Sequence, residues 1–405
     1  MARDLAGWQG AVALFQEAAP NFLPLHFSAL PSAAMFRHLG RVATGGLANA
    51  FALSRLSLET PRQFVDRRFS SPEVKGVFTP WAFHLDYGPD VRGGAMFLFV
   101  SAMSAYRRGM NVIEGGAGRL ASALAMLVKS YGGEVLTGTT VTGIEIRSGR
   151  AAGVRTQRGD VISARRAVVA NVTPKRLFGG LVPNDHLPAG FRRRIGRFRY
   201  AAGTFVVYLA LAQELEWRGA PDLARFSYVH LCGTTEELGR NYAEAMAGLI
   251  PARPMLIVNQ TSHVDPSRAP PGKNAVRIHA RAFPANIRGD AAGQIEARDW
   301  DSAKEAVADR LIDLLAEHAP NARSALLGRH AMSPLDLERS NPNLVDGDCN
   351  GGSHHLDQYY FARPALGWSR YATPIQALHM IGASQWPGSG IHGASGYLLA
   401  QQLLA

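Results

Sequence analysis

The sequence contains few cysteines, and this limits the chemistry that it can carry. Cys232 and Cys349 are the only two in 405 residues, and neither belongs to a C-x-x-C pair. A disulfide framework and a thiolate metal site are therefore excluded. We expect the protein to work in a reducing compartment, the cytoplasm.

Long hydrophobic runs are also missing. The longest, AMFLFVSAM and TFVVYLALA, are well below the ~18 residues that a membrane span needs. The N-terminus carries Asp4 and lacks a basic start followed by a continuous apolar core, so it does not resemble a secretory signal. We expect a soluble protein, or one that contacts a membrane peripherally through its apolar N-terminal helices and basic charge.

Lysine is scarce, because only five of the 43 basic residues are lysine and the rest are arginine. The formal net charge is +11, but the basic residues are spread thinly, with one short run at Arg192, Arg193 and Arg194. A nucleic-acid binder would gather them on one stripe, so we expect no nucleic-acid partner. The sequence also has no G-x-S-x-G, H-E-x-x-H or P-loop motif, which disfavours hydrolases and kinases.

The size and the 47% hydrophobic content allow one or two substantial cores. Residues 1–109 are expected to be helical and to form a substrate or cap region. Thr60 before Pro61 and Ser71 before Pro72 predict two helix starts, because a hydroxyl cap followed by proline favours the first helical turn.

Residues 110–175 follow a different pattern. A GGAG turn precedes an amphipathic helix predicted from about Arg119 to Tyr131, which Gly132 and Gly133 end. The strands VTGIEIR, AAGVRTQ and VISARRAVVA follow, separated by Ser148-Gly149 and Arg158-Gly159. This pattern predicts a helix that leads into an antiparallel meander.

Residues 176–330 are predicted to form a separate layer of strands and one helix. Thr173-Pro174 predicts another helix start, the expected strands are GTFVVYLAL, MLIVNQTS and NAVRIHARAF, and the helix spans 301–318. Strands with a flanking helix are typical of an α+β unit, here a substrate-binding domain.

Residues 331–405 contain a strand, ALHMIG, a glycine-rich stretch and an apolar helix, YLLAQQLLA. Glycines between a buried strand and a helix let the backbone approach a ligand and direct amides at an anion. This favours a cofactor site, although the glycines would equally permit a tight crossover. The glycines concerned are Gly382, Gly388, Gly390, Gly393 and Gly396.

Metal binding is not expected. Asp346, Asp348, Asn350 and Gly351 match part of an EF-hand loop, but its twelfth position is Asp357 rather than glutamate, and Pro342 and the Gly351-Gly352 pair deny the flanking helices. His354 and His355 are adjacent rather than three or four residues apart, so we expect them to be solvated or hydrogen-bonded loop residues.

Two long segments resemble phytoene-desaturase-like flavoproteins, within the branch named pyridine nucleotide-disulfide oxidoreductase domain proteins. One is SPLDLERSNPNLVDGDCNGGSHHLDQYYFARPALGWSRYATPIQALHMIGASQWPGSGIHGASGYLLAQQLL, and the other is IEGGAGRLASALAMLVKSYGGEVLTGTTVTGIEIRSGRAAGVRTQRGDVISARRAVVANVTP. The resemblance implies FAD, with a C-terminal loop lying against the isoalloxazine and Val141 placing its strand against the adenine. The loop residues it implies are Gly382, Ala383, Ser384, Gly388, Gly390, Gly393 and Gly396.

The resemblance also implies the fold and the activity. We expect a mixed α/β (α+β) chain with an incomplete FAD-binding Rossmann-like domain of the glutathione-reductase type and a sheet-and-helix substrate domain. The expected activity is hydride transfer between flavin N5 and an apolar organic substrate. No catalytic residue is assigned, since the flavin carries the hydride chemistry, and His392 is expected to be a loop histidine with local hydrogen bonds.

One departure from the family qualifies this expectation. The family opens with a strand, a G-x-G-x-x-G turn, a helix and then an acidic residue, and this complete arrangement occurs nowhere in the 405 residues. The chain therefore resembles a family member without its first βαβ unit. The alternative is a non-catalytic remnant or partner subunit that binds FAD weakly or only in a complex. For an active enzyme, the expected partner is a separate chain that supplies the missing unit.

Overall fold

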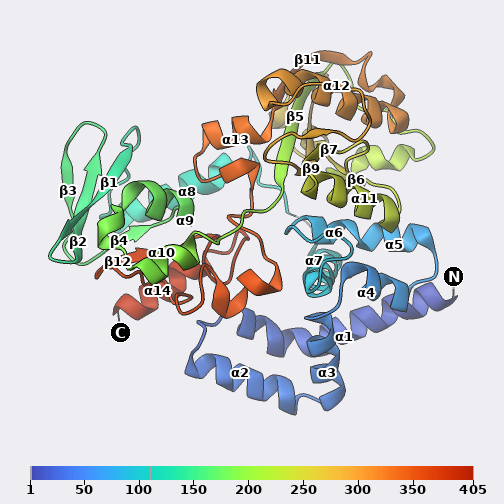
Figure 1. The fold of residues 1–405 in the computed structure, drawn as a ribbon. Helices are drawn as coiled ribbons and strands as arrows, with labels where there is room; N and C mark the ends of the chain where they lie inside the picture. Colours follow the sequence, from blue (N-terminus) through green and yellow to red (C-terminus); the bar gives the residue numbers. More distant parts are fainter. Residues whose placement is uncertain (1, 110, 405) are drawn as a thin grey trace.

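The computed structural model describes residues 2–109 and 111–404 of the protein. The fold has three parts (Figure 1): a helical N-terminal region, a sheet unit covered by a long helix, and a region that combines a small meander with the C-terminal segment. The N-terminus lies at the helical end and the C-terminus beside the meander. The architecture is mixed α and β, as the sequence predicted.

The N-terminal region is a layer of helices around an aromatic core, in which Phe64, Phe69 and Phe99 are fully buried. Thr60 accepts a hydrogen bond from the amide of Gln63 and Ser71 one from Val74, so both predicted helix starts are confirmed. The helices are α1 (Ala2–His26), α2 (Ala33–Thr44), α3 (Leu47–Leu56), α4 (Pro61–Arg68), α5 (Pro72–Phe78), α6 (Pro80–Phe83) and α7 (Gly94–Arg108).

The surface of α2 and α3 carries large apolar side chains in contact with solvent. Phe36, Leu47 and Phe51 are 65%, 83% and 71% exposed. Within the described residues, no helix is long and apolar enough to cross a membrane. The predicted peripheral membrane contact stays a prediction, and these three side chains are where it would form.

The sheet unit has strand order β11-β5-β9-β8-β6, and every neighbouring pair is antiparallel. The predicted strands at 203–211 and 274–283 are confirmed with the same bounds, whereas the third is shorter than predicted. The strands are β5 (Gly203–Leu211), β6 (Tyr228–Leu231), β8 (Leu256–Asn259), β9 (Asn274–Phe283) and β11 (Leu326–Met332), with α11 (Thr235–Met246) and a small parallel pair of β7 (Leu249–Ile250) and β10 (Gly289–Asp290) beside them.

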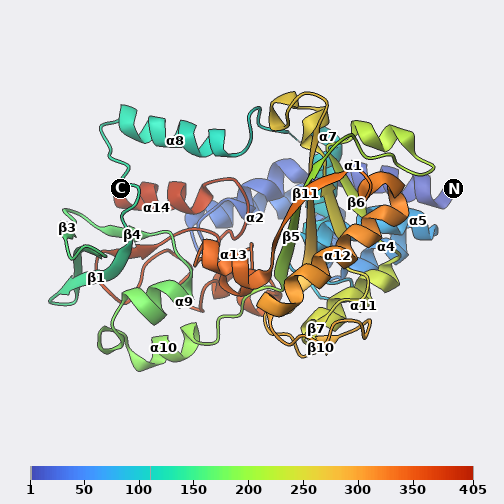
Figure 2. The same cartoon turned by 90° about the horizontal axis from the view of Figure 1, so that it is seen from above.

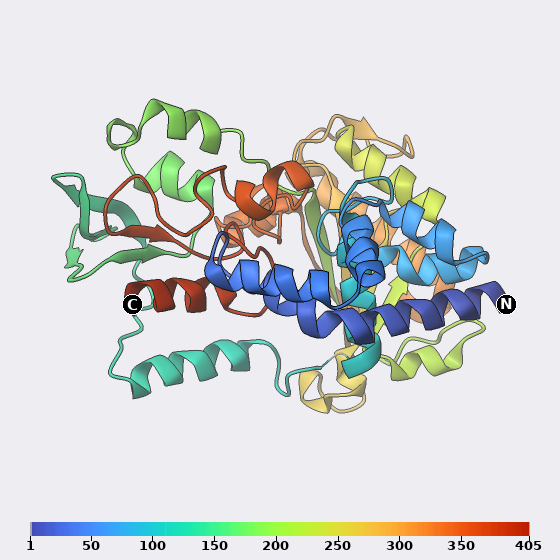
Figure 3. The same cartoon turned by 90° about the horizontal axis from the view of Figure 1, so that it is seen from below.

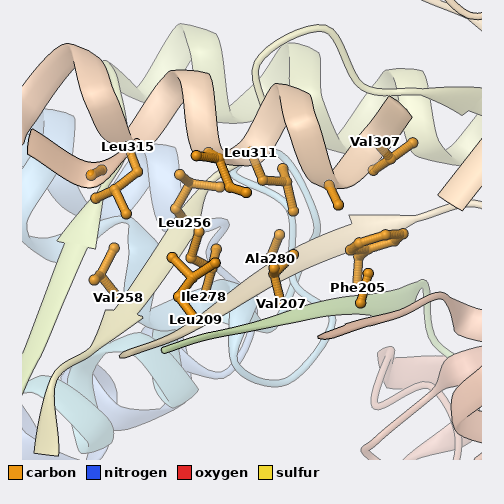
Figure 4. Close-up of a cluster of buried hydrophobic side chains, with 14 of the residues drawn as sticks. Phe205, Val207, Leu209, Leu256, Val258, Ile278, Ala280, Val307, Leu311 and Leu315 are labelled. Carbon is orange, nitrogen blue, oxygen red and sulfur yellow. The ribbon is translucent and has the colours of Figure 1, made fainter. Parts of the chain in front are cut away.

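One face of this sheet packs against α12 (Trp300–His318). Figure 4 shows the contact, with Val207 and Ile278 of the sheet below Leu311 of the helix. Because side chains alternate along a strand, the residues between these core positions point to the opposite face. That second face has a different composition, described below.

A buried ion pair fixes α12 to the end of the sheet unit. Arg310 donates to both carboxylate oxygens of Asp290 at 2.6 Å, and their side chains are 8% and 1% exposed. Burial raises the pKa of Asp290, but the hydrogen bonds from Arg310, Gln294 and Ile295 outweigh it and lower the value to about 2.

This pair predicts a pH dependence of stability. Since the folded-state pKa of Asp290 is below its unfolded value, its stabilisation is present above about pH 4 and is lost as the pH falls through about 2. We expect the Asp290→Asn variant to be less stable than the wild type near neutral pH, with the gap closing towards about pH 2. Urea unfolding across this range measures it. Asp185→Asn, at an exposed position, should follow the wild-type curve, and a gap that does not change with pH would contradict the assignment.

The third region begins with the predicted meander, β1 (Val141–Arg147), β2 (Arg150–Thr156) and β3 (Val161–Ser163), all antiparallel. The predicted strand over 161–170 is wrong as a single element. It divides into β3 and a separate β4 (Val168–Ala170), which pairs in parallel with β12 (Leu378–Met380). A pairing across more than two hundred residues leaves no trace in the local pattern.

After β4 the chain turns through short helices. The predicted helix start at Thr173-Pro174 is present, but the Thr173 hydroxyl makes no capping bond. The elements are α9 (Pro174–Arg176), a π-helical turn over Leu177–Leu181, and α10 (Ala189–Ile195), with α13 (Pro334–Ser340) and α14 (Ala394–Leu404) later in the chain.

Helix α8 (Gly118–Ser130) lies apart from the rest of the fold (Figure 2), and none of its residues is buried. It matches the helix predicted before the meander. Leu120, Leu124, Leu127 and Tyr131, four residues at helical spacing, are 36%, 55%, 52% and 85% exposed. A stripe of this kind normally packs against another element, so α8 presents an uncovered apolar face.

Candidate functional site

The segment between β12 and α14, residues 381–393, is called the glycine loop below. It contains four glycines with positive φ: Gly382 (98°), Gly388 (102°), Gly390 (145°) and Gly393 (62°). Residues with a Cβ rarely adopt these conformations. Gly388, Gly390 and Gly393 have the spacing G-x-G-x-x-G and stand directly before α14.

Gly382 lies where the carboxyl ends of the two parallel strands meet. A Cβ at this position would lie 2.1 Å from Oδ1 of Asn171, the residue that follows β4. The amide of Gly382 donates to Oγ of Ser395 at 3.0 Å. In open α/β sheets, ligands bind outside the carboxyl ends of the strands, and here the backbone at that position has no room for a side chain.

Gly388 lies against His354, since a Cβ there would lie 2.6 Å from Nε2 of the imidazole. That Nε2 accepts a hydrogen bond from the amide of Ser389 at 3.0 Å, and the Tyr87 hydroxyl donates to the His354 carbonyl. Burial lowers the pKa of His354 well below its usual value, so the ring is neutral and can act as an acceptor. The expected hydrogen-bonded role is confirmed for His354, and the solvated role is wrong, because the side chain is fully buried.

Arg363 holds the glycine loop in place. Its guanidinium is fully buried and donates only to main-chain oxygens: to Ala383 at 3.0 and 2.7 Å, to Ser353 at 2.7 Å, and to Gly351 and Gly352 at 3.2 Å each. Burial lowers the pKa of Arg363 to about 10, so it stays charged near neutral pH. One side chain therefore joins the glycine loop to the 351–353 segment.

Asp348 anchors the same segment from its other side. The side chain is fully buried and accepts from the amides of Ala201 at 3.0 Å, Asn350 at 2.6 Å and Gly352 at 2.6 Å. The aspartates that resembled a calcium loop thus include one that satisfies backbone amides. Among the described residues, no three histidine, cysteine or acidic side chains are arranged to hold a metal ion.

Two of the predicted site residues face inward. The hydroxyl of Ser384 donates to the Gly351 carbonyl at 2.7 Å, and the Ala383 carbonyl accepts from Arg363. Their protein contacts shape the glycine loop.

The last helix begins at Ala394, three residues earlier than predicted, so Gly396 lies in its first turn and outside the loop. The first bond within the helix runs from the amide of Tyr397 to the Gly393 carbonyl at 3.0 Å, so the amides of Ser395 and Gly396 precede the helical ladder. Nδ1 of His392 accepts from the amide of Ala394 at 3.1 Å, as expected for a loop histidine with a local hydrogen bond. Amides at this position of a helix, here those of Ser395 and Gly396, are of the kind that binds anions.

The structure brings the seven predicted C-terminal residues into one continuous segment. Val141 lies in a different sheet, at the start of β1 and paired with Thr156. Sequence reasoning missed Asn171, Asp348 and Arg363, which shape the site. Only Asn171 left a signal, because it directly follows a short apolar strand and precedes a predicted helix start.

Comparisons with known proteins identify the family. A model of the family described as flavin containing amine oxidoreductase matches residues 5–404. A rat (Rattus norvegicus) protein named pyridine nucleotide-disulfide oxidoreductase domain-containing protein 2 is 31% identical over 70% of this chain and 49% of its own. The neurosporene-forming phytoene desaturase of Cereibacter sphaeroides is 22% identical over 75% of this chain and 55% of its own.

Solved structures share the fold. A crystal structure of an oxidoreductase from Methanosarcina mazei has a TM-score of 0.58 and 18% identity, covering 90% of this chain and 72% of that chain. The chain spans about half the length of the curated relatives it matches.

Proposed function

Because the chain belongs to the flavin containing amine oxidoreductase family, we propose that it transfers a hydride between FAD and an organic substrate. The main support for this proposal is the close contact between Gly382 and Asn171 at the carboxyl ends of β4 and β12. Gly382 begins the segment that leads to the amides of α14. A position that cannot accept a Cβ, beside a helix N-terminus, suits a flat ring with an anionic arm.

The residues present fit FAD in two respects. The missing Cβ at Gly382 and Gly388 lets the glycine loop pack closely against Asn171 and His354, and the amides of Ser395 and Gly396 precede the helical ladder of α14. When bound, FAD supplies the hydride-accepting centre. The chain's own part is to stabilise negative charge at the flavin with the helix dipole and free amides of α14, while Arg363 keeps the loop in its shape.

The proposal includes a further polypeptide segment at the flavin domain. β4 pairs with β12 alone, and parallel sheets of only two strands are not stable by themselves. Helix α8 also exposes an apolar stripe. We propose that a parallel α/β segment, corresponding to the part of the relatives that this chain does not cover, covers α8 and extends the sheet at β4.

Binding of FAD to the purified full chain tests the proposal, alone and after co-expression with the polypeptide encoded immediately upstream. Quenching of flavin fluorescence gives the affinity, with FMN and riboflavin as comparison ligands. We expect saturable FAD binding that is tighter in the co-expressed preparation. FAD binding no stronger than that of riboflavin in both preparations would instead support the non-catalytic remnant.

A further inference from the structure

The face of the five-stranded sheet opposite α12 carries an unusual row of basic side chains. Arg277, His279 and Arg281 alternate along β9 with Val276, Ile278 and Ala280, which lie in the core. Successive members of the row are about 6.6 Å apart along the strand. The sequence pattern R-x-H-x-R therefore places three nitrogen-bearing side chains on one surface.

All three side chains have a buried nitrogen without a hydrogen-bond partner: Nε of Arg277, Nε2 of His279 and Nε of Arg281. A buried polar atom left unpaired is destabilising, so such atoms are rare in folded proteins. Three of them on one strand face indicate a position for a ligand.

Within the described part of the chain, neither Arg277 nor Arg281 forms an ion pair. Arg281 is 8% exposed and donates only to neutral oxygens, the Thr204 hydroxyl at 3.3 Å and the His84 carbonyl at 3.0 Å. The nearby carboxyl is Asp86, and burial followed by the charge of Asp348 raises its pKa to about 7.

Two further histidines border the row. Nε2 of His230 on β6 lies 3.2 Å from Nε2 of His84, and Trp81 stacks on the His84 ring at 5.6 Å. Cross-strand pairing places His230 and His279 on either side of Ile257 in the same register row. Burial lowers the pKa of both His84 and His230, so the two rings are neutral and one donates to the other.

This surface is connected to the glycine loop by a short series of contacts. Tyr87, three residues after His84, donates to the carbonyl of His354, whose ring accepts from the Ser389 amide. The 84–87 segment therefore contacts both the row, through the bond from Arg281 to the His84 carbonyl, and His354, whose ring contacts the glycine loop.

We propose that Arg277, His279 and Arg281 bind the carboxylate of an organic acid substrate. The two guanidinium groups supply charge and directed N–H donors, and guanidinium pairs with carboxylate particularly well. His279 contributes a neutral ring nitrogen between them. That this acid is a substrate rests on the proposed function, whereas its binding to the row does not. The expected substrate is then no longer wholly apolar, because it has an apolar body and an acidic end.

Calorimetric titration of the full chain with octanoate, octan-1-ol and inorganic phosphate tests this site. We expect octanoate to bind, and octanol and phosphate to bind at least tenfold more weakly. The main variant is Arg277→Met. No described residue forms a hydrogen bond with the Arg277 side chain, so its loss should not lower thermal stability, whereas octanoate should bind about tenfold or more weakly. Arg277→Lys should recover part of the affinity.

A matched control is Arg147→Met, which removes an exposed arginine from β1 and should bind octanoate like the wild type. Equal binding by the wild type and Arg277→Met, or preference for octanol or phosphate, would overturn the proposal. Flavin content is measured in the same preparations. Octanoate binding without FAD binding would support this site and refute the proposed function. FAD binding without octanoate binding would support the proposed function and refute this site.

Discussion

Replacing Arg363 with methionine is expected to lower the free energy of unfolding by about 3 kcal/mol or more. The side chain is fully buried and its hydrogen bonds go to four carbonyls. Its removal leaves the carbonyls of Ala383 and Gly352 without a donor, whereas Gly351 and Ser353 keep bonds from Ser384 and Gln358. Each unsatisfied buried acceptor costs about 1–3 kcal/mol. Urea unfolding of the full chain measures the change.

The control is Arg158→Met, at an exposed turn position, which should stay within about 0.5 kcal/mol of the wild type. Because Arg363 positions Ala383, its loss should also release the glycine loop and reduce FAD binding. An Arg363→Met protein as stable as the wild type would show that the loop does not depend on this side chain.

The Gly382→Ala substitution is expected to have the second large effect. A φ of 98° strains any residue with a Cβ by about 1–3 kcal/mol, and the added methyl would lie 2.1 Å from the Asn171 side chain. The Asn171 side chain would have to move, or the loop would have to shift. We expect lower stability and the loss of bound FAD, measured by urea unfolding and by flavin content.

Two comparisons separate strain from steric clash. Gly190→Ala in α10 has an ordinary φ and no atom within 4 Å of the new Cβ, so it should retain stability and flavin. Combining Gly382→Ala with Asn171→Ala removes the clashing oxygen and should restore part of the stability. If Gly382→Ala behaves like Gly190→Ala, the close approach at this position is unimportant.

The elements that the sequence predicted well are those specified by neighbouring residues. β5 and β9 have the predicted bounds, because turn residues flank continuous apolar or alternating runs. The starts of α4 and α5 were predictable because each has a hydroxyl cap followed directly by a proline. These features need no tertiary information.

The features that the sequence did not predict depend on distant contacts. β4 was joined to the meander because its partner, β12, lies in the last thirty residues of the chain. Arg363 resembles any other arginine until the fold buries it among carbonyls. The start of α14 was placed too late because Gly396 was read as loop, although a helix tolerates a glycine in its first turn.

The row of basic residues on β9 was predictable from the sequence in part only. Its strand was predicted, and the alternation R-x-H-x-R was visible in it. What the sequence could not reveal is that the three nitrogens would be buried without partners, since this depends on the neighbouring strands and on the segment around His84.

The most direct test of the central claim is the stoichiometry of FAD on the chain, co-expressed with the polypeptide encoded immediately upstream and determined from flavin absorbance after denaturation. The account predicts one FAD per chain at saturation in the wild type and in Gly190→Ala, and little or none in Gly382→Ala. The absence of FAD from the wild type, or equal FAD in wild type and Gly382→Ala, would contradict it.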